Sequence, residues 1–177
     1  GTVAIDGCWF NGNASTGTAG TAGGGAIRVQ GGDATITDSA FSSNTARSNG
    51  GALFVSSGTA TVTNVTIAAN SAGIGGGISV SSSAAASLSL SFVTVANNTG
   101  VTGSGVRVGN LGLCALENSV VTANGGGGGN DELVGPCTTD AVSFVADTGA
   151  TFGPLQNNGG PTPTLAIAAD SVLLDAG

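Results

Sequence analysis

The stretch Gly24-Gly25-Ala26-Ile27-Arg28-Val29 returns further along the chain as Gly50-Gly51-Ala52-Leu53-Phe54-Val55. Two weaker copies follow, Gly76-Gly77-Ile78-Ser79-Val80 and Gly103-Ser104-Gly105-Val106-Arg107-Val108. After each copy comes a second alternating run, such as Ala60-Thr61-Val62-Thr63, and then an apolar-x-x-Asn motif. A motif that recurs at a nearly fixed period of about 26 residues predicts a repeat protein with one supersecondary unit per repeat.

Within each element, apolar residues alternate with small or polar ones, which is the period of a half-buried strand. Three short strands separated by Gly, Ser and Asn turns predict one coil of a parallel β-helix, because each strand then pairs with its equivalent in the next coil. The usual crossover rule makes this helix right-handed. We therefore expect an all-β solenoid of about five coils, each of about 26 residues, with an irregular C-terminal closing segment.

Stacking the coils brings equivalent residues into columns. Four aliphatic columns form the expected core: Ile27, Leu53, Ile78 and Val106; Val29, Val55, Val80 and Val108; Ile36, Val62, Leu90 and Leu116; Phe10, Phe41, Ile67, Val95 and Val121. The asparagine that ends each motif gives a further column: Asn13, Asn44, Asn70, Asn98 and Asn124. We expect a structural asparagine ladder at this turn, where Asn tolerates left-handed backbone and stacked amides hydrogen-bond from coil to coil.

The coil rhythm fades after Asn124, so we expect coils over residues 1–124 and a glycine loop with a closing segment over residues 125–177. Candidate strands in that segment are Asp131–Val134, Ala141–Val145 and Leu165–Ile167. We expect the segment to finish and cover the stack, since a terminal coil offers unpaired backbone groups. The chain starts in mid-coil, which indicates a piece of a longer protein.

The balance of charge excludes whole classes of partner. The net charge is −7 with a pI near 4.1, and three arginines supply all the Lys and Arg side chains. No basic patch for nucleic acid or for an anionic membrane can be assembled from them. The sequence also lacks an uninterrupted apolar run long enough to span a bilayer. We expect no nucleic-acid partner and no membrane insertion of this segment.

The residue types that most catalytic sites need are missing. Without histidine or lysine there is no Ser-His-Asp triad, no imidazole base and no Schiff-base lysine. The acidic residues are dispersed, whereas glycoside hydrolysis needs two carboxylates that face each other. We therefore expect no enzyme; the alternative is a carbohydrate-binding or carbohydrate-cleaving β-helix, similar to a polysaccharide lyase or hydrolase. The Thr35/Thr37 and Thr61/Thr63 pairs are better explained by strand propensity than by ice binding.

The chain has three cysteines. Cys8 aligns with an interior column of small residues, so we interpret it as a small buried hydrophobe. Cys114 and Cys137 would fasten the irregular segment to the last regular coil, a closure worth about 3 kcal/mol in the chain-entropy model. Such a disulfide implies an oxidising, extracytoplasmic setting. Zinc is disfavoured, because there is no histidine and the cysteines are scattered.

The stretch from Gly126 to Leu133 matches the Gly-Gly-x-Gly-x-Asp-x-apolar pattern of calcium-binding β-rolls. The pattern occurs once, and a single copy supplies only part of a calcium site. Asn130 and Asp131 are therefore the calcium candidates, and a flexible glycine loop is the competing interpretation. We expect no other cofactor.

Two motifs resemble known families. The repeated Gly-Gly-Ala-Ile/Leu with Phe-x-x-Asn resembles the coils of bacterial pectin-lyase-fold surface proteins, including polymorphic membrane proteins. The run Phe152–Thr164, followed by Ser171–Gly177, resembles the closing segment of choice-of-anchor Q domain proteins, with Val172-Leu173-Leu174 in place of the usual Pro-Ala-Ile. The resemblance implies a right-handed β-helix that is secreted or on the cell surface, and it carries over no catalytic residue.

We therefore expect an extracellular structural or adhesive protein, secreted or at the cell surface. Terminal coils with unpaired strands would allow copies to join end to end into a filament. The expected partner is thus a second copy of the chain, or a host or surface glycan or protein.

Overall fold

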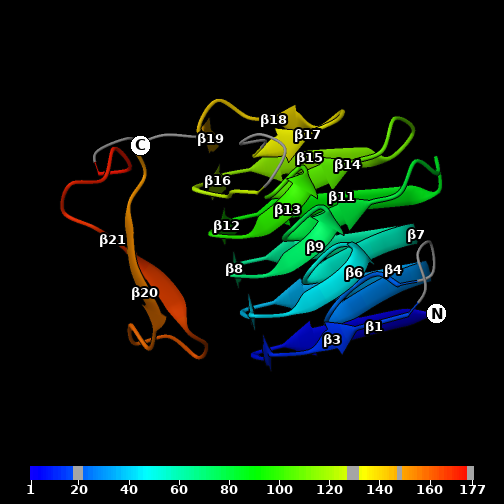
Figure 1. Ribbon diagram of the computed structural model, residues 1–177, viewed down its shortest axis with the longest axis horizontal. Coiled ribbons are helices and arrows are strands. Elements are labelled where there is room, and N and C mark those ends of the chain that lie inside the picture. Colours follow the sequence, from blue (N-terminus) through cyan, green and yellow to red (C-terminus); the bar gives the residue numbers. More distant parts are fainter. Residues whose placement is uncertain (18–21, 127–131, 147–148, 175–177) are drawn as a thin grey trace.

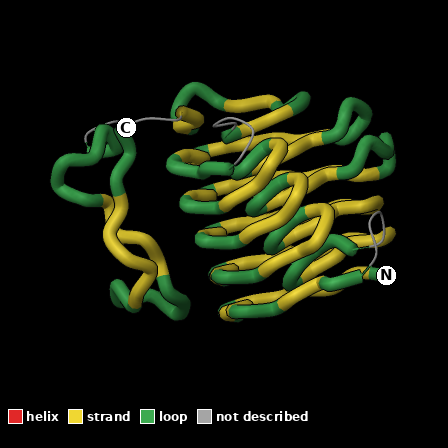
Figure 2. The backbone as a smooth tube through the Cα atoms, in the orientation of Figure 1, coloured by secondary structure: helices red, strands yellow, loops and turns green. Residues whose placement is uncertain are grey.

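Every regular element in the described part of the chain is a β-strand. The computed structural model describes residues 1–17, 22–126, 132–146 and 149–174. Figure 1 shows the strands stacked as successive coils of a parallel β-solenoid, and Figure 2 shows the path of the backbone through the same coils. The predicted all-β parallel β-helix is confirmed. The described residues contain no helix long and apolar enough to cross a membrane.

The first and second sequence elements of each coil share one nine-stranded sheet. Its strands are β1 (Thr2–Asp6), β4 (Ile27–Thr37), β7 (Leu53–Thr63), β10 (Ile78–Val80), β11 (Ala86–Ser91), β14 (Val106–Val108), β15 (Leu113–Glu117), β17 (Leu133–Val134) and β18 (Thr138–Thr139). In β4 and β7 the two elements merge into single strands of 11 residues. Gly31 and Gly58, both with positive φ, allow the backbone to turn there without ending the strand. Later coils keep the two elements apart.

Two smaller parallel sheets complete the coils. The five apolar-x-x-Asn elements and β19 (Phe144–Ala146) form a six-stranded sheet, in which the five elements are β2 (Trp9–Asn11), β5 (Ala40–Ser42), β8 (Thr66–Ala68), β12 (Thr94–Ala96) and β16 (Val120–Thr122). After each of the first four asparagines comes a strand of a four-stranded sheet: β3 (Ala14–Ser15), β6 (Thr45–Asn49), β9 (Ser71–Ile74) and β13 (Thr99–Thr102). Sequence analysis missed this last sheet, because segments such as β6 carry no large apolar side chain to reveal a strand period.

The aliphatic columns fill the interior of the stack. Ile36 pairs with Val62, Val62 with Leu90, and Leu90 with Leu116. All four are at most 1% exposed. Full burial of such a side chain is worth about 1.5–3 kcal/mol. The columns therefore hold one coil on the next, as the repeat pattern predicted.

The stack continues past Asn124, where the sequence placed the end of the coils. β17 pairs with β14, β18 with β15 and β19 with β16. We call these three strands the open upper coil, because none of them has a second neighbour among the described strands. The sequence indicates two of them as candidate strands, Asp131–Val134 and Ala141–Val145, but in the sequence Thr148 stands where an asparagine ends each earlier repeat.

The C-terminal segment forms an antiparallel hairpin of β20 (Phe152–Gln156) and β21 (Thr164–Ile167). Figures 1 and 2 show the hairpin beside the stack and not across its upper end. Thr162, in the hairpin loop, donates a hydrogen bond from Oγ1 to the backbone oxygen of Asp38, 3.2 Å away. Of the segment expected to finish and cover the stack, residues 132–146 do finish it, whereas the hairpin does not cover the upper coil. Antiparallel pairing satisfies much of the hairpin's own backbone, so the hairpin does not depend on the edges of that coil.

Candidate functional site

The five predicted ladder asparagines lie in one column and are hydrogen-bonded in series. Each of the first four donates from its backbone N and from Nδ2 to Oδ1 of the asparagine in the next coil, 31, 26, 28 and 26 residues later. The N···O distances lie between 2.8 and 3.0 Å. Nδ2 of the upper four also reaches a carbonyl oxygen of the coil below. The column therefore joins the coils through side chains as well as through the sheets.

Four of the five ladder side chains are buried, and none of the five asparagines has a left-handed backbone. Asn44, Asn70, Asn98 and Asn124 are at most 3% exposed. The left-handed residue of each turn is the one before the asparagine: Gly12, Ser43, Ala69, Asn97 and Ala123. The expected backbone role of the asparagines is therefore wrong. Asparagine suits these positions because its amide offers both donors and an acceptor to buried backbone groups of neighbouring coils.

The ladder ends on a carboxylate that sequence analysis did not single out. Glu132, 4% exposed, accepts hydrogen bonds from the backbone N and from Nδ2 of Asn124. An ionised carboxylate only accepts, so it suits the end of a series in which every donor points the same way. Glu132 follows Asn124 by 8 residues and not by a whole repeat, so periodicity gave no signal for it.

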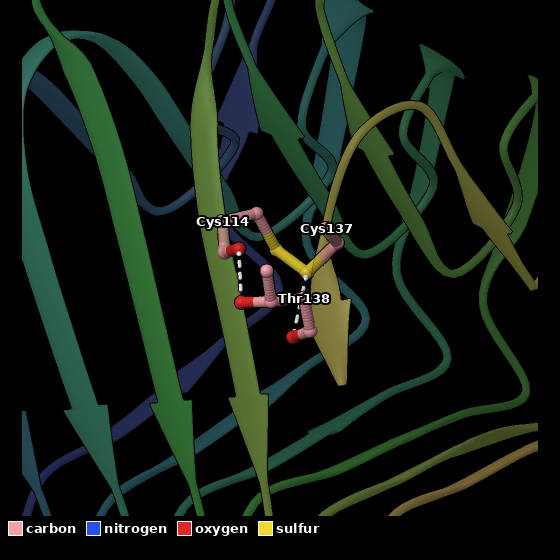
Figure 3. Close-up of a disulfide and its surroundings, with 3 residues drawn as sticks. All are labelled: Cys114, Cys137 and Thr138. Atoms are coloured by element: carbon pink, nitrogen blue, oxygen red, sulfur yellow. Dashed lines mark hydrogen bonds between the residues drawn. A yellow bond between two sulfur atoms is a disulfide. The ribbon is translucent and has the colours of Figure 1, made fainter. Parts of the chain in front are cut away.

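Cys114 and Cys137 form the predicted disulfide (Figure 3). Their Cα atoms are 4.4 Å apart across a sequence separation of 23. Thr138 adds a hydrogen bond from Oγ1 to the backbone oxygen of Cys114, 3.2 Å away. The bridge thus fastens the open upper coil to β15. Cys8 is a free thiol and is half-buried, since no described coil lies below it.

The calcium candidates Asn130 and Asp131 lie outside the described residues. Within the described ranges, no three His, Cys, Asp or Glu side chains gather in a way that would hold a metal ion. Glu132, which follows the two candidates in the sequence, is engaged with the asparagine ladder.

A second column runs along the outer flank, at the turn between the nine-stranded and six-stranded sheets. We call it the turn column; its members are Asp38, Asn64, Phe92 and Asn118, with φ between 47° and 56°. The backbone N of Asp38, Asn64 and Phe92 donates to a carbonyl oxygen of the next coil. Nδ2 of Asn64 donates to Oδ1 of Asp38. The side chains of successive coils are therefore about one strand spacing apart, close to 4.8 Å.

Asp140 continues this flank into the open upper coil. Its carboxylate accepts hydrogen bonds from the backbone N of Asn118, at 3.0 Å, and of Ser143, at 2.8 Å. The pKa of Asp140 is lowered below its ordinary value, mainly by hydrogen bonding to the Ser143 side chain and also by hydrogen bonds from backbone N–H groups. Desolvation by burial raises the pKa and offsets part of this lowering. The ionised carboxylate thus helps to hold the last turn of the stack.

The turn column and the hairpin enclose a cleft of about 240 Å³, which we call the flank cleft. On the stack side, its lining includes Asp38, Asn64, Phe92, Thr66 and Thr94. On the hairpin side, it includes Pro161, Thr162 and Leu165. A carboxylate, a carboxamide, hydroxyls and an aromatic ring thus face one small space. Sequence analysis missed this site, because none of these residues stands out before the position of the hairpin is known.

Comparisons with protein-family models, with curated proteins and with solved structures find no match for this chain. Its function is therefore inferred from the geometry of the stack and of its flank.

Proposed function

We propose that this chain is an extracellular structural and adhesive protein, secreted or at a cell surface, whose copies join end to end. The observation that carries the proposal is the open upper coil. β17, β18 and β19 each have a single neighbour among the described strands, and the hairpin that follows lies on the flank. An unpaired strand edge of this kind recruits further strands.

We propose that the occupant of this edge is a second copy of the stack. Successive coils pair in parallel, so the lowest coil of a second copy would continue the nine-stranded sheet through β1 and the six-stranded sheet through β2. Contact of this head-to-tail kind does not close on itself, so it propagates into a filament. Each copy carries a net charge of −7, and the resulting repulsion is screened by salt. We therefore expect assembly to increase with ionic strength.

Other features of the stack support the same proposal. The asparagine ladder and the aliphatic columns tie each coil to the next, which makes the stack stiff along its axis. The Cys114–Cys137 disulfide favours an oxidising compartment, where secreted and surface proteins mature. The resemblance of the repeats to pectin-lyase-fold surface proteins favours the same location.

Thr138 and Thr139 of β18 provide a matched test. Thr139 pairs with the buried Leu116, so by strand alternation its side chain faces the end of the core, whereas Thr138 pairs with Ala115 on the outer face. Both threonines are exposed. Thr139→Lys therefore puts a cation into the contact, and Thr138→Lys puts the same cation on the side wall. Thr138→Lys also loses the hydrogen bond to Cys114, but the Cys114–Cys137 disulfide still fastens β18 to β15.

Size-exclusion chromatography and electron microscopy at low and high salt distinguish the outcomes. We expect filaments from the wild type and from T138K, most of all at high salt, and monomers from T139K. Wild-type monomers at high salt would overturn the end-to-end contact. Equal assembly by T139K would show that the contact does not use the open upper coil.

A further inference from the structure

Phe92 is the unexpected member of the turn column. Its φ is 56°, in the left-handed region, where a bulky side chain is a steric outlier. The other members are Asp38, Asn64 and Asn118, residue types that tolerate this region. The Phe92 side chain is also 61% exposed, so burial in the core does not explain its presence. An exposed aromatic ring on a strained backbone indicates a functional role.

The ring stands beside a polar pair in the flank cleft. The carboxylate of Asp38 and the carboxamide of Asn64 are hydrogen-bonded to each other, which fixes both groups on neighbouring coils. Together they offer acceptors and a donor to adjacent groups on a ligand. Thr66 and Thr94, which pair with each other across β8 and β12, add two hydroxyls to the lining.

The hairpin forms the opposite wall of the flank cleft. The hydrogen bond from Thr162 to the backbone oxygen of Asp38 fixes the hairpin loop beside the polar pair. Leu165 adds an apolar contact to this wall. The volume of about 240 Å³ lies below the range of about 300–1,000 Å³ that is usual for drug-sized ligands. The cleft is therefore suited to one ring of a larger ligand.

We propose that the flank cleft binds one sugar ring of a neutral glycan. The C–H face of the ring lies against Phe92, and two neighbouring hydroxyls of the sugar bond to Asp38 and Asn64. An aromatic face provides apolar contact area, while the polar pair sets the orientation of the sugar. This inference rests on the adhesive part of the proposed function and not on the end-to-end contact.

Other ligand classes fit the flank cleft less well. An anionic ligand would be repelled by the Asp38 carboxylate and by the net charge of −7. An entirely apolar ligand would desolvate Asp38, Asn64 and the threonine hydroxyls without replacing their hydrogen bonds to water. A neutral sugar has both an apolar face and hydroxyl groups, so it satisfies both kinds of lining.

The test uses saturation-transfer NMR of the whole chain with glucose, galactose, mannose, fucose and N-acetylglucosamine. Isothermal titration with the sugar that binds best then gives the affinity. Phe92→Asn removes the ring but keeps a residue that accepts left-handed backbone, and Asp38→Asn removes the charge and replaces one acceptor oxygen by a donor. Asn118→Gly is the matched control, because Asn118 shares the turn column but does not line the flank cleft.

We expect affinity about tenfold weaker in F92N and in D38N and unchanged in N118G. F92N should unfold at the same or a higher denaturant midpoint than the wild type, which separates lost binding from lost folding. Failure of the wild type to bind any of the five sugars, or undiminished binding by F92N, would overturn the proposal. So would unfolding of F92N at a lower midpoint, because the ring would then be structural. A monomeric chain that binds sugar keeps this proposal and rejects the filament, and filaments without sugar binding do the reverse.

Discussion

Removing one amide from the middle of the asparagine ladder tests directly what holds coil on coil. In Asn70→Ala, the backbone N and Nδ2 of Asn44 lose their shared acceptor, Oδ1 of Asn70. The carbonyl oxygens of Phe41 and Ala68 and Oδ1 of Asn98 lose the donor Nδ2. All five residues are at most 1% exposed, so water does not replace the lost partners.

The expected loss follows from the groups that lose a partner. Oδ1 of Asn98 keeps the bond from the backbone N of residue 70, and Nδ2 of Asn44 keeps its bond to the oxygen of Phe10. Three backbone groups lose the side chain of residue 70 as a partner: the N–H of Asn44 and the C=O groups of Phe41 and Ala68. The buried N–H without a partner costs about 1–3 kcal/mol and each carbonyl loses a hydrogen bond worth about 0.5–1.5 kcal/mol, so N70A should lower the free energy of unfolding by about 2–6 kcal/mol. That is a large share of a typical net stability of about 5–15 kcal/mol.

Asn13→Ala is the matched control at the exposed end of the ladder. Oδ1 of Asn44 keeps the bond from the backbone N of residue 13, and water reaches this coil. The expected loss is below about 1 kcal/mol. Guanidinium unfolding followed by circular dichroism measures both variants. Equal losses in N70A and N13A would refute the reasoning, because burial of the amides would then contribute nothing.

Three further predictions concern other parts of the stack. Replacing Cys114 and Cys137 together by serine should cost about 3 kcal/mol in the chain-entropy model, and hydrogen exchange should rise first in the open upper coil; an unchanged midpoint and exchange pattern would contradict this. The buried Ser79 hydroxyl finds no hydrogen-bond partner among the described residues, so Ser79→Ala should leave stability unchanged or raise it by up to about 1 kcal/mol; a clear loss in the unfolding midpoint would count against it. The pKa of Asp140 is lower in the folded state than its ordinary value of 3.8, so its contribution to stability is present above pH 3.8 and is lost as the pH falls through the lower folded pKa. Unfolding midpoints measured across this acid range should therefore fall less steeply for Asp140→Asn than for the wild type, and identical slopes would reject the assignment.

Periodicity made the interior of the stack predictable, because a column is defined by spacing alone. The positions of Leu53, Ile67 and Leu90 follow from counting residues from one repeat to the next. The asparagine column follows in the same way, although its hydrogen bonds turned out to serve buried backbone groups and not a strained turn. Sequence analysis therefore found the column and its amide bonds from coil to coil, and it missed that the amides also bond buried backbone carbonyls.

The features that sequence analysis missed leave no repeating pattern of residues in the sequence. Glu132 ends the ladder after a short loop, so no repeat places it there. The strand β6 has no apolar alternation that would reveal it. The flank cleft depends on a contact between Thr162 and Asp38 across a sequence separation of 124, and no local pattern indicates where the hairpin lies. Each of these features is set by tertiary packing.

The residues with left-handed backbone show which positions require glycine and which accept other residue types. At Gly24 and Gly50 an added Cβ would lie 2.0 and 2.1 Å from the carbonyl oxygens of residues 27 and 53, so glycine is required there. Gly7 occupies the position in the first coil that corresponds to Asp38 in the second. A Cβ added at Gly7 would meet no atom within 4 Å. The core therefore requires no particular side chain in the turn column, and any residue that tolerates the backbone satisfies the fold of the stack. Phe92 does not tolerate it well and gains little burial, so folding alone does not account for it; what remains is the surface it presents to the flank cleft.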